Sequence, residues 1–269
     1  MDLRSKLEVT HNARELGGIP LAGGGVTASG ILFRSDALDR LTEAGAAALA
    51  ELGVGTIVDL RTDGERHRAP DVVPDGVAFL ALPVQGGAMD ELVARLLPAD
   101  GAAHAFTDDE VQAIVAQIPS LAELYVAILA SSAPAFATLA RTVLDAAGTP
   151  RPGVLFHCTA GKDRTGLSAA ILLSVAGAER RAIIDDYTRT GENLAGPFAE
   201  SLLGLITALG LPVVPQLRSL ATESPAAAID AALEWIAVEH GDAAGYLRSG
   251  GLTEAETARL REVLRGSAI

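Results

Sequence analysis

A stretch near the middle of the chain, residues 153–167, constrains the fold more than any other part of the sequence. The apolar run at residues 154–156 has the length and composition of a buried strand. After a polar loop, residues 167–173 are mostly apolar and predict a buried helix that ends near Gly177. The only cysteine, Cys158, therefore stands at the carboxyl end of a strand, and the loop after it leads into a helix.

Strand and helix patterns alternate elsewhere, which indicates an α/β fold with a central, mostly parallel sheet flanked by helices. Three more runs predict strands: residues 31–33, 56–60 and 77–84. The region from 86 to 147 is helical in pattern, with capping boxes at Thr107 and Ser120, and Pro134 fits the first turn of another helix. Aromatic residues make up only 4% of the chain, which disfavours a β sandwich.

The loop that begins at Cys158 has the residues needed to bind a tetrahedral oxyanion. A tight turn at Gly161 can point successive backbone N–H groups inward, and the following helix adds N–H donors and the positive end of its dipole. Arg164, six residues after Cys158, can bind two oxygens with its planar guanidinium. A cysteine among such donors is expected to be a thiolate near neutral pH and to attack a bound phosphate.

Two other interpretations of this stretch carry less weight. A lone cysteine after an apolar run is usually an inert core residue. Here a histidine directly precedes it and an arginine follows at the right spacing, a combination that seldom arises by chance. A nucleotide-binding P-loop would need Gly in place of Phe156 and Ser or Thr in place of Asp163. The stretch therefore favours a phosphate-monoester hydrolase.

The order His157-Cys158-x5-Arg164-Thr165-Gly resembles the signature of the cysteine-based tyrosine phosphatases. The form Gly-Lys-Asp-Arg-Thr-Gly is similar to the atypical bacterial tyrosine and lipid phosphatases of the PtpB type. Other landmarks of that family resemble, in the same order, residues 12–18, 32–35, 58–61 and 186–187. The resemblance covers nearly the whole chain and implies a cysteine-based tyrosine phosphatase-like fold. It also implies one phosphatase domain over residues 1–269, with a helical lid inserted at residues 190–222.

The mechanism that we expect has two steps. Cys158 attacks phosphorus to give a cysteinyl-phosphate, and water then hydrolyses this intermediate. The phosphate is bound by Arg164 and by a cradle made of Thr159, Ala160, Gly161 and Lys162. Backbone amides and arginine supply the electrostatic stabilisation that a metal would otherwise give, so no metal or other cofactor is expected. Thr165 can hydrogen-bond the sulfur and help it leave in the second step. His157 either fixes the shape of the loop from behind or is merely buried.

A general acid must protonate the leaving oxygen. Most tyrosine phosphatases carry it on a Trp-Pro-Asp loop, which is absent here because the only tryptophan, Trp235, is not followed by proline. In PtpB-type relatives the aspartate inside the signature loop is the proposed acid, which here is Asp163. Lys162, one of two lysines, suggests a site for more negative charge than one phosphate. Asp59 and Arg61 follow a strand at the same sheet edge, where they either orient the loop or form a structural turn.

The chain has 21 Lys and Arg against 34 Asp and Glu, a net charge of −13, so bulk charge favours neither nucleic acid nor an anionic membrane as partner. Residues 1–10 lack the apolar core of a signal peptide, and the apolar stretches at 169–178 and 202–214 are too short or interrupted to span a bilayer. We expect a cytoplasmic protein, or one secreted without a signal peptide.

The expected function is hydrolysis of phosphoric monoesters. The resemblance implies phosphotyrosine and phosphoinositides as substrates, so the expected partners are phosphorylated proteins or phosphoinositides. Two other classes stay open: a non-catalytic phosphate-binding module that uses the same cradle, and a sulfurtransferase with a phosphatase-like loop. A dithiol reductase is disfavoured because the chain has no second cysteine.

Overall fold

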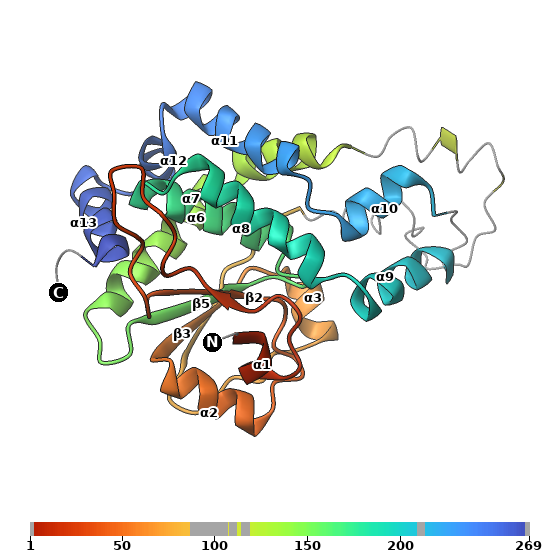
Figure 1. The fold of residues 1–269 in the computed structure, drawn as a ribbon, viewed down its shortest axis with the longest axis horizontal. Helices are drawn as coiled ribbons and strands as arrows, with labels where there is room; N and C mark the ends of the chain where they lie inside the picture. Colours follow the sequence, from red (N-terminus) through yellow and green to blue (C-terminus); the bar gives the residue numbers. More distant parts are fainter. Residues whose placement is uncertain (1–2, 87–106, 108–111, 114–118, 209–212, 267–269) are drawn as a thin grey trace.

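The computed structural model describes residues 3–86, 107, 112–113, 119–208 and 213–266. Its centre is a five-stranded sheet in the order β1-β2-β5-β3-β4 (Figure 1). The strands are β1 (Arg14–Glu15), β2 (Leu32–Ser35), β3 (Val54–Asp59), β4 (Ala78–Ala81) and β5 (Gly153–His157). Only β1 is antiparallel to its neighbour, and the other strands pair in parallel. The predicted α/β fold with a mostly parallel sheet is confirmed.

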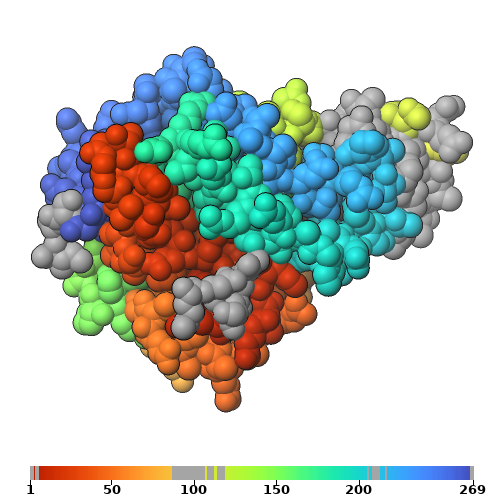
Figure 2. Space-filling model, in the orientation of Figure 1, coloured from red at the N-terminus to blue at the C-terminus, as the bar shows by residue number. Residues whose placement is uncertain are grey.

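Helices cover both faces of the sheet (Figure 1). One face carries α6 (Leu121–Ala147), α7 (Asp163–Ala176), α8 (Arg180–Asn193), α11 (Ala226–His240), α12 (Ala243–Ser249) and α13 (Glu254–Arg265), and the other carries α1 (Leu3–Leu7) and α2 (Glu43–Glu51). Near one end of the strands lie α3 (Asp63–Arg68), α9 (Pro197–Ala208) and α10 (Pro215–Thr222). Figure 2 shows the N-terminal segment, in red, on the surface between α8 and α2.

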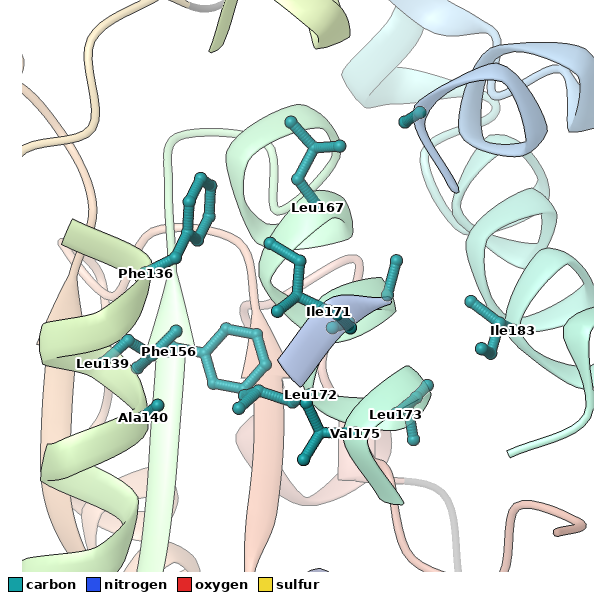
Figure 3. Packing of buried hydrophobic residues seen from close by; sticks show 14 of the residues in the cluster. Phe136, Leu139, Ala140, Phe156, Leu167, Ile171, Leu172, Leu173, Val175 and Ile183 are labelled. Carbon is teal, nitrogen blue, oxygen red and sulfur yellow. The ribbon is translucent and has the colours of Figure 1, made fainter. Parts of the chain in front are cut away.

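Side chains alternate across β5 as its apolar sequence predicts. Val154 and Phe156 enter the larger hydrophobic core, whereas Leu155 enters the smaller core beneath α2. Figure 3 shows Phe156 pointing between α6, with Leu139, and α7, with Leu172. Each such side chain contributes about 1.5–3 kcal/mol when buried, and a one-residue slip of the strand would exchange the two faces. The packing of β5 therefore fixes where the chain ends its strand and begins the loop at Cys158.

Helix α6 differs from its sequence prediction in one respect. The capping box at Ser120 is present, with Glu123 as its partner, whereas Glu110, the partner in the box predicted at Thr107, falls outside the described residues. Pro134 does not begin a new helix but lies inside one continuous helix of 27 residues. A proline in a helix interior costs roughly 3 kcal/mol, and burial of Ile128 and Leu129 before it and of Phe136 after it outweighs this cost.

By length and composition, α6 is the one helix in the described part of the chain that is long and apolar enough to cross a membrane. Its side chains instead pack against β5, α7 and α11 in the core. The core helix of a globular domain passes the same test, so α6 gives weak evidence for a membrane span.

The predicted lid range, residues 190–222, contains α9 and α10 but begins inside α8. Thr190 is buried in the last turn of α8, where its hydroxyl accepts hydrogen bonds from Arg14 and Arg34. The first residues of the range are thus part of the helical layer over the sheet. Within the range, α9 and α10 contact each other.

Candidate active site

The candidate site lies where β5 ends at His157 and α7 begins at Asp163. The parallel neighbours of β5 end at the same level, because both Ser35 of β2 and Asp59 of β3 pair with His157. This is the sheet edge at which α/β proteins bind ligands. Cys158, the first residue of the connecting loop, is only 3% exposed.

Donors from the N-terminal segment and from β2 hold the carbonyl groups of the loop. Asn12 Nδ2 donates to the carbonyl oxygens of Ala160, at 3.2 Å, and of Gly161, at 2.8 Å. Arg34 also donates to Gly161 O, at 2.7 Å, and the backbone N–H of residue 37 donates to Thr159 O. Across a trans peptide the C=O and the next N–H point in opposite directions. The amides of residues 160, 161 and 162 therefore point away from these donors, as an anion-binding nest requires.

Gly161 is required at its position by its backbone conformation and by its surroundings. Its φ is +64°, in the left-handed region, and a Cβ atom there would lie 2.4 Å from the carbonyl oxygen of Ser35. No other residue fits without moving β2 or the loop. The turn that the sequence predicted at Gly161 is present.

A buried ion network fixes the side chains that hold the loop. Asp186 of α8 accepts from Arg14 Nε at 2.7 Å and from Arg34 Nη1 at 2.6 Å. Burial alone would raise the pKa of Asp186, but the two arginines lower it to about 2, so it is ionised. Arg14 also donates to the carbonyl and side-chain oxygens of Asn12. Segments that the sequence linked to the loop only by resemblance thus meet directly behind it.

Glu65 of α3 binds the guanidinium of Arg164. Its two carboxylate oxygens accept from Arg164 Nη1 and Nη2, both at 2.7 Å, and Thr159 Oγ1 donates to the same carboxylate. Burial alone would raise the pKa of Glu65, but Arg164 and Thr159 lower it to about 2. Glu65 was not predicted from the sequence, although it forms a capping box with Thr62. That pattern by itself indicates only a helix start, so it gives no sign of a contact with the loop.

His157 lies behind the loop, fully buried, with Nε2 3.0 Å from Asp71 Oδ2 and Nδ1 3.1 Å from Cys158 O. Burial alone would lower the pKa of His157, but Asp71 and Asp59 raise it above its usual value, which favours the imidazolium. Arg61 pairs with Asp59 at 2.8 Å and with Asp71 at 2.9 Å. Asp59 and Arg61 therefore belong to the ion network around His157, which lies behind the loop.

Among the described residues, one group of side chains could hold a metal ion. It consists of Asp59, Asp71 and His157, whose ligand atoms lie within 4.8 Å of one another. The guanidinium of Arg61 already lies within hydrogen-bond distance of both carboxylates. A metal ion would have to compete with this cation for the same oxygens.

Asp163, the first residue of α7, is held by a pair of buried tyrosines. Tyr125 Oη donates to Asp163 Oδ1 at 2.7 Å and lies 2.6 Å from Tyr187 Oη. Burial, followed by the charge of Asp163, raises the pKa of Tyr125 well above its usual value, so this phenol stays neutral and can donate. No sequence pattern indicates a contact between Asp163 and Tyr125, which is 38 residues away on α6.

Lys162 and Thr165 are buried, and their contacts differ from those the sequence suggested. Lys162 Nζ donates to the carbonyl of Leu220, in α10, at 2.6 Å and lies 3.6 Å from Asp163 Oδ1. Thr165 Oγ1 has no hydrogen-bond partner in the part of the chain that the structure describes, so the suggested bond to Cys158 is not formed. Its role in a second step stays a prediction.

A cavity of about 490 Å³ opens beside the loop, between α3 and α9. Thr159 and Glu65 line it on the loop side, and His11 and Phe198 line another part, with ring centroids 5.6 Å apart. Of the loop residues 158–164, Thr159 is the one that lines this cavity.

Comparisons with known proteins agree with this geometry. Residues 5–266 match the model of a family described as the tyrosine phosphatase family. The triple specificity protein phosphatase PtpB of Mycobacterium tuberculosis is 32% identical over 255 residues, covering 88% of this chain and 91% of the relative. A protein of Cupriavidus necator named as a tyrosine-protein phosphatase is 34% identical over 258 residues, covering 94% of this chain and 85% of the relative.

Among solved structures, TpbA of P. aeruginosa matches at 23% identity over 61% of this chain and 71% of that chain. Its TM-score of 0.29 is too low to bear on the fold or the function. The family match, in contrast, spans nearly the whole chain and includes every residue of the loop. The chain belongs to the tyrosine phosphatase family, whose members are cysteine-based protein tyrosine phosphatases.

Proposed function

We propose that the chain hydrolyses phosphotyrosine and phosphoinositide monoesters through a cysteinyl-phosphate on Cys158. The observation that carries this proposal is the loop, whose carbonyls at 159, 160 and 161 bind donors on one side while its amides point to the other. This arrangement suits the non-bridging oxygens of a phosphate. The substrate range is supported by similarity to PtpB, whose name describes triple specificity.

In the first step, the Cys158 thiolate attacks phosphorus, the S–P bond forms and the P–O bond to the leaving group breaks. Arg164, oriented by Glu65, and the loop amides bind the equatorial oxygens. The leaving oxygen takes a proton from Asp163. In the second step, Asp163 takes a proton from water as that water attacks phosphorus, the S–P bond breaks and Thr165 donates to the departing sulfur.

Asp163 suits the acid role because Tyr125 binds only its Oδ1. Its other oxygen, Oδ2, is left for the proton, and the Asp163 side chain retains some exposure to solvent. Lys162 would reach additional substrate charge only if α10 moved away from its ammonium group, which in the structure donates to the carbonyl of Leu220. In that case residues 190–222 act as a lid on one domain, residues 1–269. Lys162→Ala should then slow hydrolysis of phosphoinositides more than that of a small aryl phosphate, and equal losses would contradict this role of Lys162.

The test is turnover of phosphotyrosine, phosphoserine and phosphoinositide substrates by the wild-type chain and by Cys158→Ser. We expect turnover by the wild type and none by the variant, with a phosphate adduct on Cys158 detectable by mass spectrometry after acid quenching. Binding without turnover would favour a non-catalytic phosphate-binding module. Formation of a persulfide from thiosulfate would favour a sulfurtransferase. Turnover by Cys158→Ser would refute the mechanism.

A further inference from the structure

The cavity beside the loop contains charged groups that the proposed reaction does not use. Arg40, after β2, and Arg68, at the end of α3, both line it. Both side chains are exposed, and neither has an ion-pair or hydrogen-bond partner in the described part of the chain. Two unpartnered guanidinium groups at one cavity are notable in a chain with a net charge of −13.

Most of the other charged groups around this cavity already have partners. Arg61 is bound by Asp59 and Asp71, and Glu65 is bound by Arg164. The carboxylate of Asp36 accepts from the backbone N–H groups of residues 11 and 12. Asp39, half-buried, is the one acid at the cavity without such a partner among the described residues. The charges left over are thus two guanidinium groups and one carboxylate, with the ring of His11 beside them.

The position of Lys162 strengthens the case for these two arginines. The sequence singled out Lys162 as the cation for charge beyond one phosphate, but its side chain is 2% exposed, and its ammonium donates to the carbonyl of Leu220. Arg40 and Arg68 need no such rearrangement, because both already line the cavity that Thr159 of the loop also lines.

We propose that Arg40 and Arg68 form a second anion subsite, which binds a further phosphate on a polyol whose first phosphate lies in the loop. This inference rests on the proposed function. The planar guanidinium is suited to bind phosphate oxygens in pairs, and about 490 Å³ is within the usual range for a small-molecule site.

Asp39 decides between two kinds of bisphosphorylated substrate. The carboxylate of Asp39, which lines the same cavity as the two arginines, can accept hydrogen bonds from the hydroxyl groups of a polyol ring, whereas it repels the carboxylates that flank phosphotyrosine in an acidic peptide. A ligand with both phosphates and hydroxyls therefore satisfies all three side chains. The chemical class assigned to the subsite is a phosphorylated polyol.

The test measures binding apart from catalysis. Cys158→Ser in the full chain is titrated by calorimetry, at fixed ionic strength, with an inositol monophosphate, an inositol bisphosphate and a doubly phosphorylated peptide. We expect the bisphosphate to bind about tenfold or more tighter than the monophosphate, the scale of a charge-assisted hydrogen bond. Adding Arg40→Met and Arg68→Met should reduce this ratio to near one, while Lys at both positions should retain part of it.

Arg248→Met with Arg259→Met is the matched control, since both arginines are exposed and lie on α12 and α13, away from the cavity. This control, also made in Cys158→Ser, should keep the ratio of bisphosphate to monophosphate affinity unchanged. The proposed subsite would be overturned if the preference for the bisphosphate survived the loss of Arg40 and Arg68. It would also be overturned if Cys158→Ser alone showed no such preference. Tighter binding of the doubly phosphorylated peptide than of the inositol bisphosphate would overturn the assignment to a polyol. Turnover assays on the wild-type chain, in which Cys158 is intact, test the proposed function separately.

Discussion

Glu65→Gln tests whether the guanidinium of Arg164 is oriented by a carboxylate from α3. In the structure both outer nitrogens of Arg164 donate to Glu65 at 2.7 Å. Glutamine has nearly the same shape and is accepted at the same position of a capping box with Thr62, so α3 should still form. The substitution removes the charge and one of the two acceptors. It therefore isolates the contact with Arg164 from the cap of the helix.

The effect on stability follows from the pKa of Glu65, which Arg164 and Thr159 lower from the usual 4.5 to about 2 despite burial. At 1.36 kcal/mol for each pH unit, this corresponds to roughly 3 kcal/mol of stability at neutral pH. A carboxylate with a depressed pKa in the folded state gives its full stabilisation above pH 4.5, and this is lost as the pH falls towards 2. Glu65→Gln should lose about this amount at neutral pH and show a flatter dependence below pH 4.5.

The effect on activity follows from geometry. Without two parallel hydrogen bonds, the guanidinium of Arg164 can rotate, and misplacement of a binding group by about 1 Å costs on the order of 100-fold in rate. We expect Glu65→Gln to lower kcat/KM for p-nitrophenyl phosphate by about that factor. Urea unfolding at several pH values and steady-state kinetics measure the two effects on the same protein.

Glu256→Gln is a close control for this experiment. Glu256 is also the third residue of a capping box and also pairs with an arginine, Arg141, but it lies on α13. It should leave kcat/KM unchanged. If Glu65→Gln left kcat/KM unchanged, as this control should, the idea that Glu65 orients Arg164 would be refuted.

Three further substitutions probe other contacts of the loop. Tyr125→Phe removes the donor to Asp163 Oδ1 and should slow phenyl phosphate about tenfold but p-nitrophenyl phosphate much less, because a good leaving group needs less protonation. Gly161→Ala should abolish turnover and cost at least about 1–3 kcal/mol in urea unfolding, since its φ is +64°. Asp71→Asn should lower the pKa of His157, measured by NMR, because it removes the main group that opposes the effect of burial.

The parts of the site that are local in sequence could be predicted from it. The run at 154–156 is apolar on every residue, as expected for a strand buried on both faces, and Gly161 has no side chain where Ser35 leaves no space. Both features follow from short-range rules of chain geometry. The same rules predicted the helix after the loop and its end at Gly177.

The partners of the loop could not be predicted in this way. Glu65 precedes Arg164 by 99 residues and Asn12 precedes Gly161 by 149, so only the arrangement of the folded chain brings each pair together. Pro134 shows the converse error, in which a correct local rule gave a wrong prediction. Packing on both sides of the proline outweighed its local preference, because several buried apolar side chains contribute more than one strained turn costs.

The charges around the loop predict how a phosphate would be attracted if the loop binds it as proposed. Among the described residues, Arg164 is paired with Glu65, Arg34 with Asp186, and Arg61 and His157 with Asp71. Since these cations already face acids, the field at the loop comes mainly from its inward amides and the amino-terminal end of α7.

Fixed dipoles in a buried site are screened little by salt, unlike exposed charges such as Arg40 and Arg68. We therefore expect kcat/KM for a small aryl phosphate to change little between low and high ionic strength. Binding of an inositol bisphosphate, in contrast, should weaken markedly over the same range, and the difference should vanish when both exposed arginines are replaced by methionine. A strong salt dependence for the aryl phosphate itself would mean that net charge, and not the orientation of the amides, attracts the substrate.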